Sequence, residues 1–180
     1  TDDVMTQLAA ARTNPSIIMV VGVGGAGGNA VNHMWNLGIK GVDFMVCNTD
    51  QQALDKSPVE LKVRLGSEGL GAGNDPENGR KAAIESLDVV RQRFEASGTK
   101  MVFITAGMGG GTGTGASPVI AKLAKEMGML TVGIVTSPLA VEGKIRYEQA
   151  FRGIEELRQN VDSLLIINNE NILEIYGRLA

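Results

Sequence analysis

Cysteine, histidine and aromatic side chains are scarce in this sequence, and each shortage argues against a class of protein. Among 180 residues there is one cysteine, Cys47, and one histidine, and aromatic residues make up 4%. A single thiol forms no intramolecular disulfide and no thiolate metal cluster, which favours a reducing compartment. No Ser-His-Asp, Cys-His or metal-ligand set can be assembled, so covalent hydrolase chemistry is not expected.

Excess charge and long apolar runs are missing as well. The formal net charge is −3, so the chain lacks the basic excess that nucleic-acid binding requires. No apolar run reaches the roughly 18 residues of a membrane span, and the N-terminal residues carry no secretory hydrophobic region. We therefore expect a cytoplasmic protein with no nucleic-acid partner and no direct membrane insertion.

Glycine and aliphatic residues are abundant instead. The chain has 24 glycines and is 43% hydrophobic, a composition typical of a parallel sheet covered by helices. Apolar runs alternate with amphipathic segments, and the expected strands are 17–21, 44–47, 59–65, 101–105, 130–135 and 164–167. This alternation predicts a three-layer α/β/α domain with a mainly parallel, Rossmann-like six-stranded sheet. Residues 59–65 alternate apolar and charged side chains, which predicts a strand near the sheet edge.

The same patterns predict helix boundaries and domain limits. Residues 1–15 are expected to form a flexible N-terminal arm before a domain at 16–180. Helices are expected to open at Asn29, to run without a break after the glycine stretch 66–79, and to begin again within 172–180. Ser117 is placed to cap a further helix, with Pro118 at its first position.

The most informative segment is 107–115, which reads Gly-Met-Gly-Gly-Gly-Thr-Gly-Thr-Gly between an apolar strand and a helix. Free backbone N–H groups at a helix start bind anions, aided by the helix dipole, so the segment predicts a phosphate cradle. It contains no lysine, which separates it from the P-loop. The hydroxyls of Thr112 and Thr114 have two open interpretations, as phosphate donors or as groups that stiffen the loop.

Five other glycine-rich or polar segments also follow expected strands: 22–28, 48–50, 66–75, 137–143 and 168–171. In a parallel sheet the carboxyl ends of the strands share one rim, so all six segments are expected to line one crevice. Glu142 and Arg146, spaced i, i+4, have an open alternative as an exposed ion pair. Asn168 and Asn169 either read a base edge or serve as ordinary turn residues.

Together these segments resemble the tubulin superfamily, and within it the FtsZ-like bacterial cell-division GTPases. The resemblance rests on Gly-Gly-Gly-Thr-Gly-Thr-Gly at 109–115, on 22–29, 48–50 and 69–73, and on Pro138 with Glu142, Gly143 and Arg146. It implies GTP or GDP as ligand, with Mg²⁺ held mainly through phosphates and water rather than by a protein metal site. The residues it implies at the nucleotide are Gly24, Gly25, Ala26, Gly28, Asn29, Asn48, Asp50, Ala72, Gly73, Gly107, Gly109, Gly110, Gly111, Thr112, Gly113, Glu142, Arg146 and Asn169.

The resemblance also assigns roles within that set. It implies that Ala72 and Gly73 lie near the terminal phosphate and that Glu142 meets the ribose hydroxyls. Arg146 would contact the sugar and base, and Asn169 would help to select guanine. Two departures from the family pattern stand out, because residues 74–76 read Asn-Asp-Pro where Ala-Asn-Pro is usual, and Asn168 replaces a common proline.

As implied by the family, the parent protein hydrolyses GTP while polymerising head to tail with itself at the mid-cell division ring, together with other cell-division proteins. The family's central helix, its acidic catalytic loop and its second domain would follow Ala180. That loop acts in the nucleotide site of the neighbouring subunit, so no catalytic residue is expected in this chain and little turnover by the chain alone.

Two alternatives remain open at this point. The glycines at 22–27 match G-x-G-x-x-G and Asp50 lies near the end of the next strand, as in NAD-dependent oxidoreductases. The second cradle at 107–115 counts against this, because a dinucleotide pyrophosphate needs only one. The other alternative is a structural relative that binds nucleotide without hydrolysing it.

Overall fold

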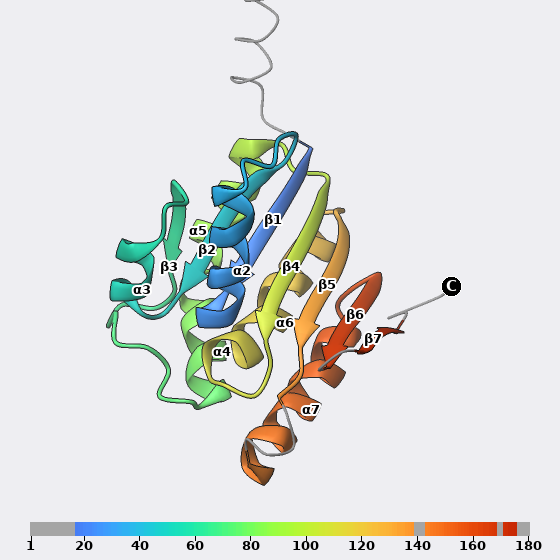
Figure 1. The fold of residues 1–180 in the computed structure, drawn as a ribbon. Coiled ribbons are helices and arrows are strands. Elements are labelled where there is room, and N and C mark those ends of the chain that lie inside the picture. The colour runs from blue at the N-terminus through green and yellow to red at the C-terminus, as the bar shows by residue number, and fades with distance from the viewer. Residues whose placement is uncertain (1–16, 139–142, 169–170, 176–180) are drawn as a thin grey trace, which may run out of the picture.

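A seven-stranded sheet with helices on both faces organises the part of the chain that the structure, a computed structural model, describes: residues 17–138, 143–168 and 171–175 (Figure 1). The strands are β1 Ile18–Val23, β2 Asp43–Asn48, β3 Leu61–Arg64, β4 Met101–Gly107, β5 Leu130–Thr136, β6 Ser163–Asn168 and β7 Asn171–Ile175. The helices are α2 Gly24–Asn36, α3 Gln51–Lys56, α4 Pro76–Glu85, α5 Leu87–Ser97, α6 Thr112–Glu126 and α7 Lys144–Arg158. Among these described residues, no helix combines the length and the apolar character needed to span a bilayer.

The strand order is β3-β2-β1-β4-β5-β6-β7, and β1 to β6 run parallel. The predicted α/β class is therefore confirmed, as is the edge position of the alternating strand β3. The helical start expected at 172–180 is wrong where the structure describes it, because residues 171–175 form β7, antiparallel to β6 with Ile166 opposite Leu173. The open edge of β6 offers backbone hydrogen-bond partners, which outweigh a weak local preference for helix.

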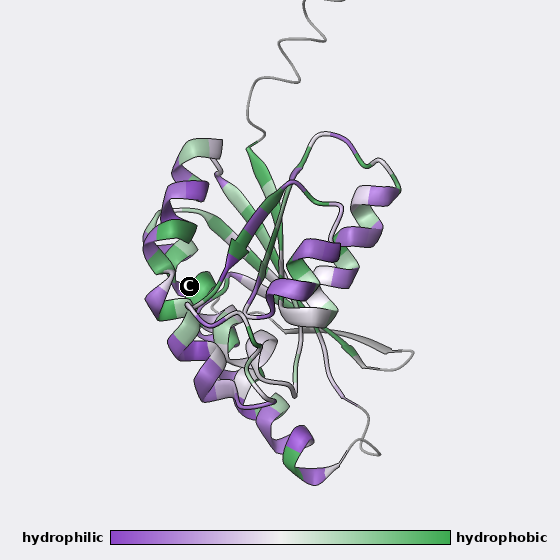
Figure 2. Cartoon of the chain, turned by 90° about the vertical axis from the view of Figure 1, so that its left-hand side faces the viewer, coloured by the Kyte–Doolittle hydropathy of each residue, from purple (hydrophilic) through white to green (hydrophobic). Residues whose placement is uncertain are grey.

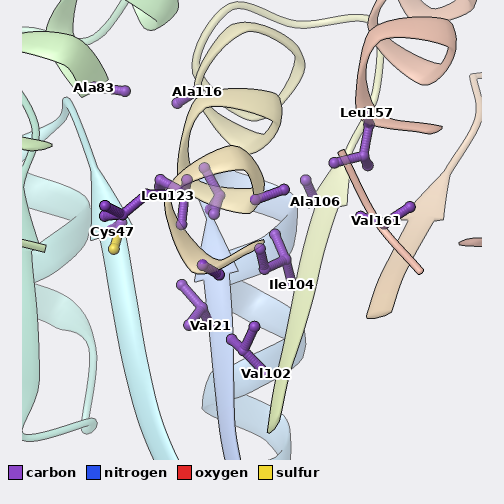
Figure 3. Packing of buried hydrophobic residues seen from close by; sticks show 14 of the residues in the cluster. Val21, Cys47, Ala83, Val102, Ile104, Ala106, Ala116, Leu123, Leu157 and Val161 are labelled. Carbon is purple, nitrogen blue, oxygen red and sulfur yellow. The ribbon is translucent and has the colours of Figure 1, made fainter. Parts of the chain in front are cut away.

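Two hydrophobic cores lie on opposite faces of the sheet, as the aliphatic composition predicts. The larger core packs α4, α5, α6 and α7 against the sheet, and Figure 3 shows Val21, Ile104 and Leu123 within it. The smaller core packs α2 and α3 against the other face, around Val31 and Phe44. Figure 2 shows mostly hydrophobic strands between helices that are banded with hydrophilic and hydrophobic residues.

Two helices begin earlier than the sequence predicts. Helix α2 starts at Gly24 rather than Asn29, so the first glycine loop is itself the opening turn of the helix. Helix α6 starts at Thr112, with Gly111 at its N-cap, and Ser117 and Pro118 lie inside it. The Gly115 N–H already donates to the Gly111 carbonyl at 3.0 Å, so the first turn closes before Ser117. Pro118 then removes only one helical donor, the one that would reach the Thr114 carbonyl.

The helix expected after residue 79 is interrupted at Ser86, which separates α4 from α5. The Ser86 hydroxyl accepts from the Gly66 N–H at 2.9 Å and donates to the Arg64 carbonyl at 3.3 Å. These two hydrogen bonds link the end of β3 to the interruption between α4 and α5. The short helix α3 has no counterpart in the sequence prediction, although its N-cap, Asp50, is a predicted site residue.

A buried hydroxyl in α6 gives a first prediction. Ser117 is 0% exposed, and its Oγ has no hydrogen-bond partner among the described residues. Since a buried unsatisfied polar group is costly, Ser117→Ala should raise the free energy of unfolding by about 1 kcal/mol. Denaturant unfolding of the two chains measures the difference.

Ser86→Ala is the matched control, because it removes a buried serine hydroxyl that does have partners. It should lower the free energy of unfolding by about 1 kcal/mol. Equal effects of the two substitutions would show that hydrogen-bond satisfaction does not distinguish these serines.

Candidate functional site

The structure brings five of the six predicted segments together at one rim of the sheet. Strands β4 and β5 run toward the lower edge of Figure 1, where the loops that follow them lie. An open cavity of about 720 Å³ lies there, and five of the six segments contribute to its wall. The sixth, 168–171, lies partly outside the described residues, and Ile167 just before it lines the cavity. The cavity is lined by Val23, Gly25, Ala26, Asn48, Thr49, Asp50, Ala53, Gly71, Ala72, Gly73, Asn74, Gly107, Met108, Gly110, Gly111, Thr112, Gly113, Thr136, Ser137, Pro138, Arg146 and Ile167.

Side-chain caps determine which of the helix N-termini around this cavity have backbone N–H groups left to bind an anion. Asp50 caps α3, accepting from the N–H groups of Gln52 at 2.9 Å and Ala53 at 3.3 Å. Asp75 caps α4 in the same way, accepting from the Glu77 N–H at 3.0 Å. Helices α2 and α6 have no side-chain cap and no acidic residue in their first turns. Their free N–H groups and positive dipole ends are therefore the anion-binding elements of the site.

These two uncapped helix starts are in direct contact. A methyl group added at Gly24 would lie 2.8 Å from the Gly113 nitrogen, and one added at Gly113 would lie 2.6 Å from the Gly107 carbonyl oxygen. Only glycine permits this approach. Since the first turns of both helices border the same cavity, a chain of two or three phosphates can contact both at once.

Two threonines fix the shape of the cradle. The Gly109 N–H donates to Thr114 Oγ1 at 2.7 Å, so that N–H is not free for a ligand. This supports the stiffening role for Thr114. The Thr112 hydroxyl lies 2.7 Å from the hydroxyl of Thr49, and both threonines line the cavity.

The segment 66–75 lies against the cradle from the other side. Its backbone is joined to the 48–51 segment by the Gly71 N–H on the Thr49 carbonyl at 3.4 Å and the Gln51 N–H on the Gly69 carbonyl at 3.0 Å. A methyl group added at Gly111 would lie 2.7 Å from the Ala72 Cβ. The carboxylate of Asp75, one of the departures from the family pattern, caps α4 and is not among the cavity-lining groups.

Arg146, in the first turn of α7, is the basic side chain of the described cavity wall. A methyl group added at Gly109 would lie 3.1 Å from its Cγ, and one added at Gly110 would lie 3.8 Å from its Nη2. No described carboxylate forms an ion pair with it. Its charge is therefore available to an anionic ligand in the cavity.

The two groups with shifted pKa values, Cys47 and Asp162, lie outside the wall of the main cavity and have structural rather than chemical roles. Burial raises the pKa of the Cys47 thiol to about 12, which leaves it protonated and unreactive. Burial also acts to raise the pKa of Asp162, but hydrogen bonds from Lys125 and the Thr131 N–H, with the Lys125 charge, lower it overall. In the described parts of the chain no three His, Cys, Asp or Glu residues are grouped to hold a metal.

Most of the predicted site residues line the main cavity. They are Gly25, Ala26, Asn48, Asp50, Ala72, Gly73, Gly107, Gly110, Gly111, Thr112, Gly113 and Arg146. Gly24, Gly28 and Asn29 line a smaller adjoining cavity of about 180 Å³ instead. Gly109 lines neither, consistent with its N–H being bonded to Thr114. Glu142 and Asn169 lie outside the described residues, so their roles, and the alternative ion pair of Glu142 with Arg146, stay predictions.

Ten lining residues were not among those individually assigned to the nucleotide: Val23, Thr49, Ala53, Gly71, Asn74, Met108, Thr136, Ser137, Pro138 and Ile167. All but Ala53, Thr136 and Ile167 lie within segments predicted to line the crevice. Most directly adjoin predicted positions, and Thr49 lies between two of them. Its small hydroxyl carries no distinctive sequence signal, since threonine is common at strand ends. Asn74 has a φ of 60°, a conformation that asparagine tolerates better than most residues.

Comparison with known proteins identifies the family of this chain. A family model described as "Tubulin/FtsZ family, GTPase domain" matches residues 17–177. The cell division protein FtsZ of Porphyromonas gingivalis is 54% identical over 168 residues, covering 92% of this chain and 37% of that protein. An empty FtsZ dimer from M. jannaschii superposes with a TM-score of 0.83 at 41% identity, covering 94% of this chain and 49% of that one.

A more distant solved structure has the same fold. CetZ2 from Haloferax volcanii, described as a GTPγS-bound protofilament, superposes with a TM-score of 0.76 at 28% identity and covers 85% of this chain and 49% of that one. This chain thus spans about half the length of these solved structures, or less than half for the P. gingivalis protein. The match to nearly the whole chain shows that it belongs to the tubulin/FtsZ family, as a GTPase domain.

Proposed function

We propose that this domain binds GTP and GDP in the 720 Å³ cavity, with the phosphates on the first turns of α2 and α6. The observation that carries the proposal is that the starts of α2 and α6, which contact each other at the cavity, lack both a side-chain cap and an acidic first turn, whereas Asp50 and Asp75 cap α3 and α4. The start of α7 is uncapped as well and contributes the Arg146 side chain to the same wall. A cavity of this size suits a mononucleotide. The related CetZ2 protofilament binds a GTP analogue.

The remaining assignments follow from position in the wall. Ala72 and Gly73 border the cradle where a terminal phosphate would lie, and Arg146 faces Gly109 and Gly110 from α7. Glu142 and Asn169 would contact ribose and guanine. Because the described wall offers no cluster of metal ligands, Mg²⁺ would be held mainly by phosphate oxygens and water, where it supplies charge neutralisation.

Hydrolysis in the parent protein would need a residue from outside this chain. Asp50 is the carboxylate of the described cavity wall, and its Oδ1 is occupied by two N–H groups of α3. We propose that in-line attack of water on the γ-phosphate uses an acidic loop of the next subunit in a head-to-tail filament, since phosphoryl transfer depends on positioning and charge. Such heterologous contacts build open filaments. The parent would act in the cytoplasm at the division ring, with other cell-division proteins.

The test is a thermal titration of this chain with GDP, GTP and NAD⁺, each with Mg²⁺. A ligand that binds only the folded state raises the melting temperature with concentration, by an amount equivalent to about 2.7 kcal/mol at a hundred times Kd. GDP and GTP should do so and NAD⁺ should not. A rise with NAD⁺ alone would support the oxidoreductase instead.

Turnover separates the GTPase from a non-hydrolysing relative. Phosphate release from this chain alone should be small and should increase when the part of a full-length relative that this chain does not cover is supplied in trans with GTP. If that mixture forms filaments but releases no phosphate, the chain is a structural relative.

A further inference from the structure

The buried hydroxyl pair of Thr49 and Thr112 joins segments that are 63 residues apart in the sequence, at an Oγ1–Oγ1 distance of 2.7 Å. Thr49 is 5% exposed and Thr112 is 8% exposed. This is an ordinary length for a hydrogen bond between two hydroxyls, in which one must donate to the other. The pair therefore sets the direction in which a proton is presented to the cavity.

The pair leaves one proton without an acceptor. Each threonine hydroxyl carries one proton, and the bond between them uses one of the two. Neither Oγ1 makes another hydrogen bond within the described chain. Since buried polar groups are nearly always satisfied, the remaining proton requires an acceptor, and the cavity is where both residues border open space.

Thr112 is the better placed of the two to present that proton. It is the first residue of α6, so its Oγ1 belongs to the same turn whose free N–H groups face an anion. Thr49 is not part of a free helix start, and it also borders a second cavity of about 230 Å³ that residues 65–72 line. A hydroxyl that accepts one hydrogen bond becomes a stronger donor of the next.

We infer that Thr49 is a positioning residue: it donates to Thr112 Oγ1 and thereby directs the Thr112 hydroxyl proton to a phosphate oxygen of the bound nucleotide. The inference rests on the proposed nucleotide function. Thr49 also accepts the Gly71 N–H at 3.4 Å through its carbonyl, so the same residue links the phosphate cradle to the 69–73 segment.

The test compares Thr49→Val, Thr49→Ser, Thr112→Val and the Thr49→Val/Thr112→Val double variant by calorimetric titration with GDP and with guanosine. Valine keeps the shape of threonine and removes the hydroxyl, whereas serine keeps the hydroxyl. Thr112→Val should weaken GDP binding about tenfold or more, as expected for a hydrogen bond to a charged group. Thr49→Val should weaken it by roughly three- to tenfold, for loss of orientation alone.

Three further results are expected. Thr49→Ser should bind GDP like the unaltered chain, and guanosine, which lacks phosphate, should bind all variants equally. In the Thr112→Val background, adding Thr49→Val should cause no further loss, because Thr49 acts through Thr112.

Several outcomes would overturn the inference. One is an unchanged GDP affinity in Thr49→Val. Another is that Thr49→Val lowers GDP affinity by the same factor in the unaltered chain and in the Thr112→Val background. The third is that the variants lose guanosine affinity to the same extent as GDP affinity. If Thr49→Val does not fold, an unchanged GDP affinity in Thr112→Val still overturns it. Failure of the unaltered chain to bind GDP at all is a different result, since it refutes the proposed function itself.

Discussion

Gly25→Ala should leave the domain folded and weaken GDP binding by about ten- to a hundredfold. Gly25 is exposed in the first turn of α2 and borders the main cavity. A methyl group added there meets no protein atom within 4 Å, and alanine favours a helix over glycine by up to about 1 kcal/mol. The methyl group would instead fill the space through which a phosphate reaches the backbone N–H groups. Calorimetric titration with GDP, together with thermal unfolding of the free chain, measures both effects.

Gly28→Ala is the matched control for this substitution. It adds the same methyl group to the same helix, again with no protein atom within 4 Å, but Gly28 borders only the smaller adjoining cavity. Its stability should change like that of Gly25→Ala, and its GDP affinity should fall less. If Gly25→Ala binds GDP as tightly as the unaltered chain, the phosphates do not lie on α2.

Gly115→Ala should have the opposite outcome, with loss of the fold rather than of binding alone. A methyl group added at Gly115 would lie 1.8 Å from the Pro76 carbonyl oxygen and 2.8 Å from the Arg80 nitrogen. Both are backbone atoms of α4, so no side-chain rotation relieves the overlap, and α4 must move away from α6. Overpacking of a core costs about 1–3 kcal/mol when neighbours can adjust. We expect at least the upper end of that range, measured by denaturant unfolding.

The control for Gly115→Ala is again Gly28→Ala, which places alanine in a helix without overlap. Displacement of α4 should also disturb the cavity, because Asp75, the N-cap of α4, packs closely against Gly111 in the cavity wall. A methyl group added at Gly111 would lie 3.0 Å from the Asp75 nitrogen. A Gly115→Ala chain with unchanged unfolding free energy would mean that α4 and α6 do not pack as closely as described.

Sequence patterns predicted the strands and the sheet class well, because burial on both faces of a parallel sheet leaves nearly continuous apolar runs. They predicted helix starts poorly. The opening turns of α2 and α6 are glycine-rich, and glycine is usually a poor helix residue. Their place in a helix is decided by packing, of Gly27 against the Thr105 carbonyl in α2 and of Gly113 and Gly115 against the Gly107 carbonyl and α4 in α6. Likewise, β7 forms because β6 offers it an edge.

The sequence by itself determined the chemistry of this site: six strand-terminal segments, two glycine-rich cradles without lysine, and a resemblance that the family comparison bears out. The tertiary structure decided which backbone groups are free to act. In the folded chain Asp50 and Asp75 cap helices α3 and α4, and the Gly109 N–H donates to the Thr114 hydroxyl. The Thr49 hydroxyl is hydrogen-bonded to that of Thr112. A hydrogen bond between residues far apart in sequence depends on where the packed sheet and helices place them, and no local pattern records that distance.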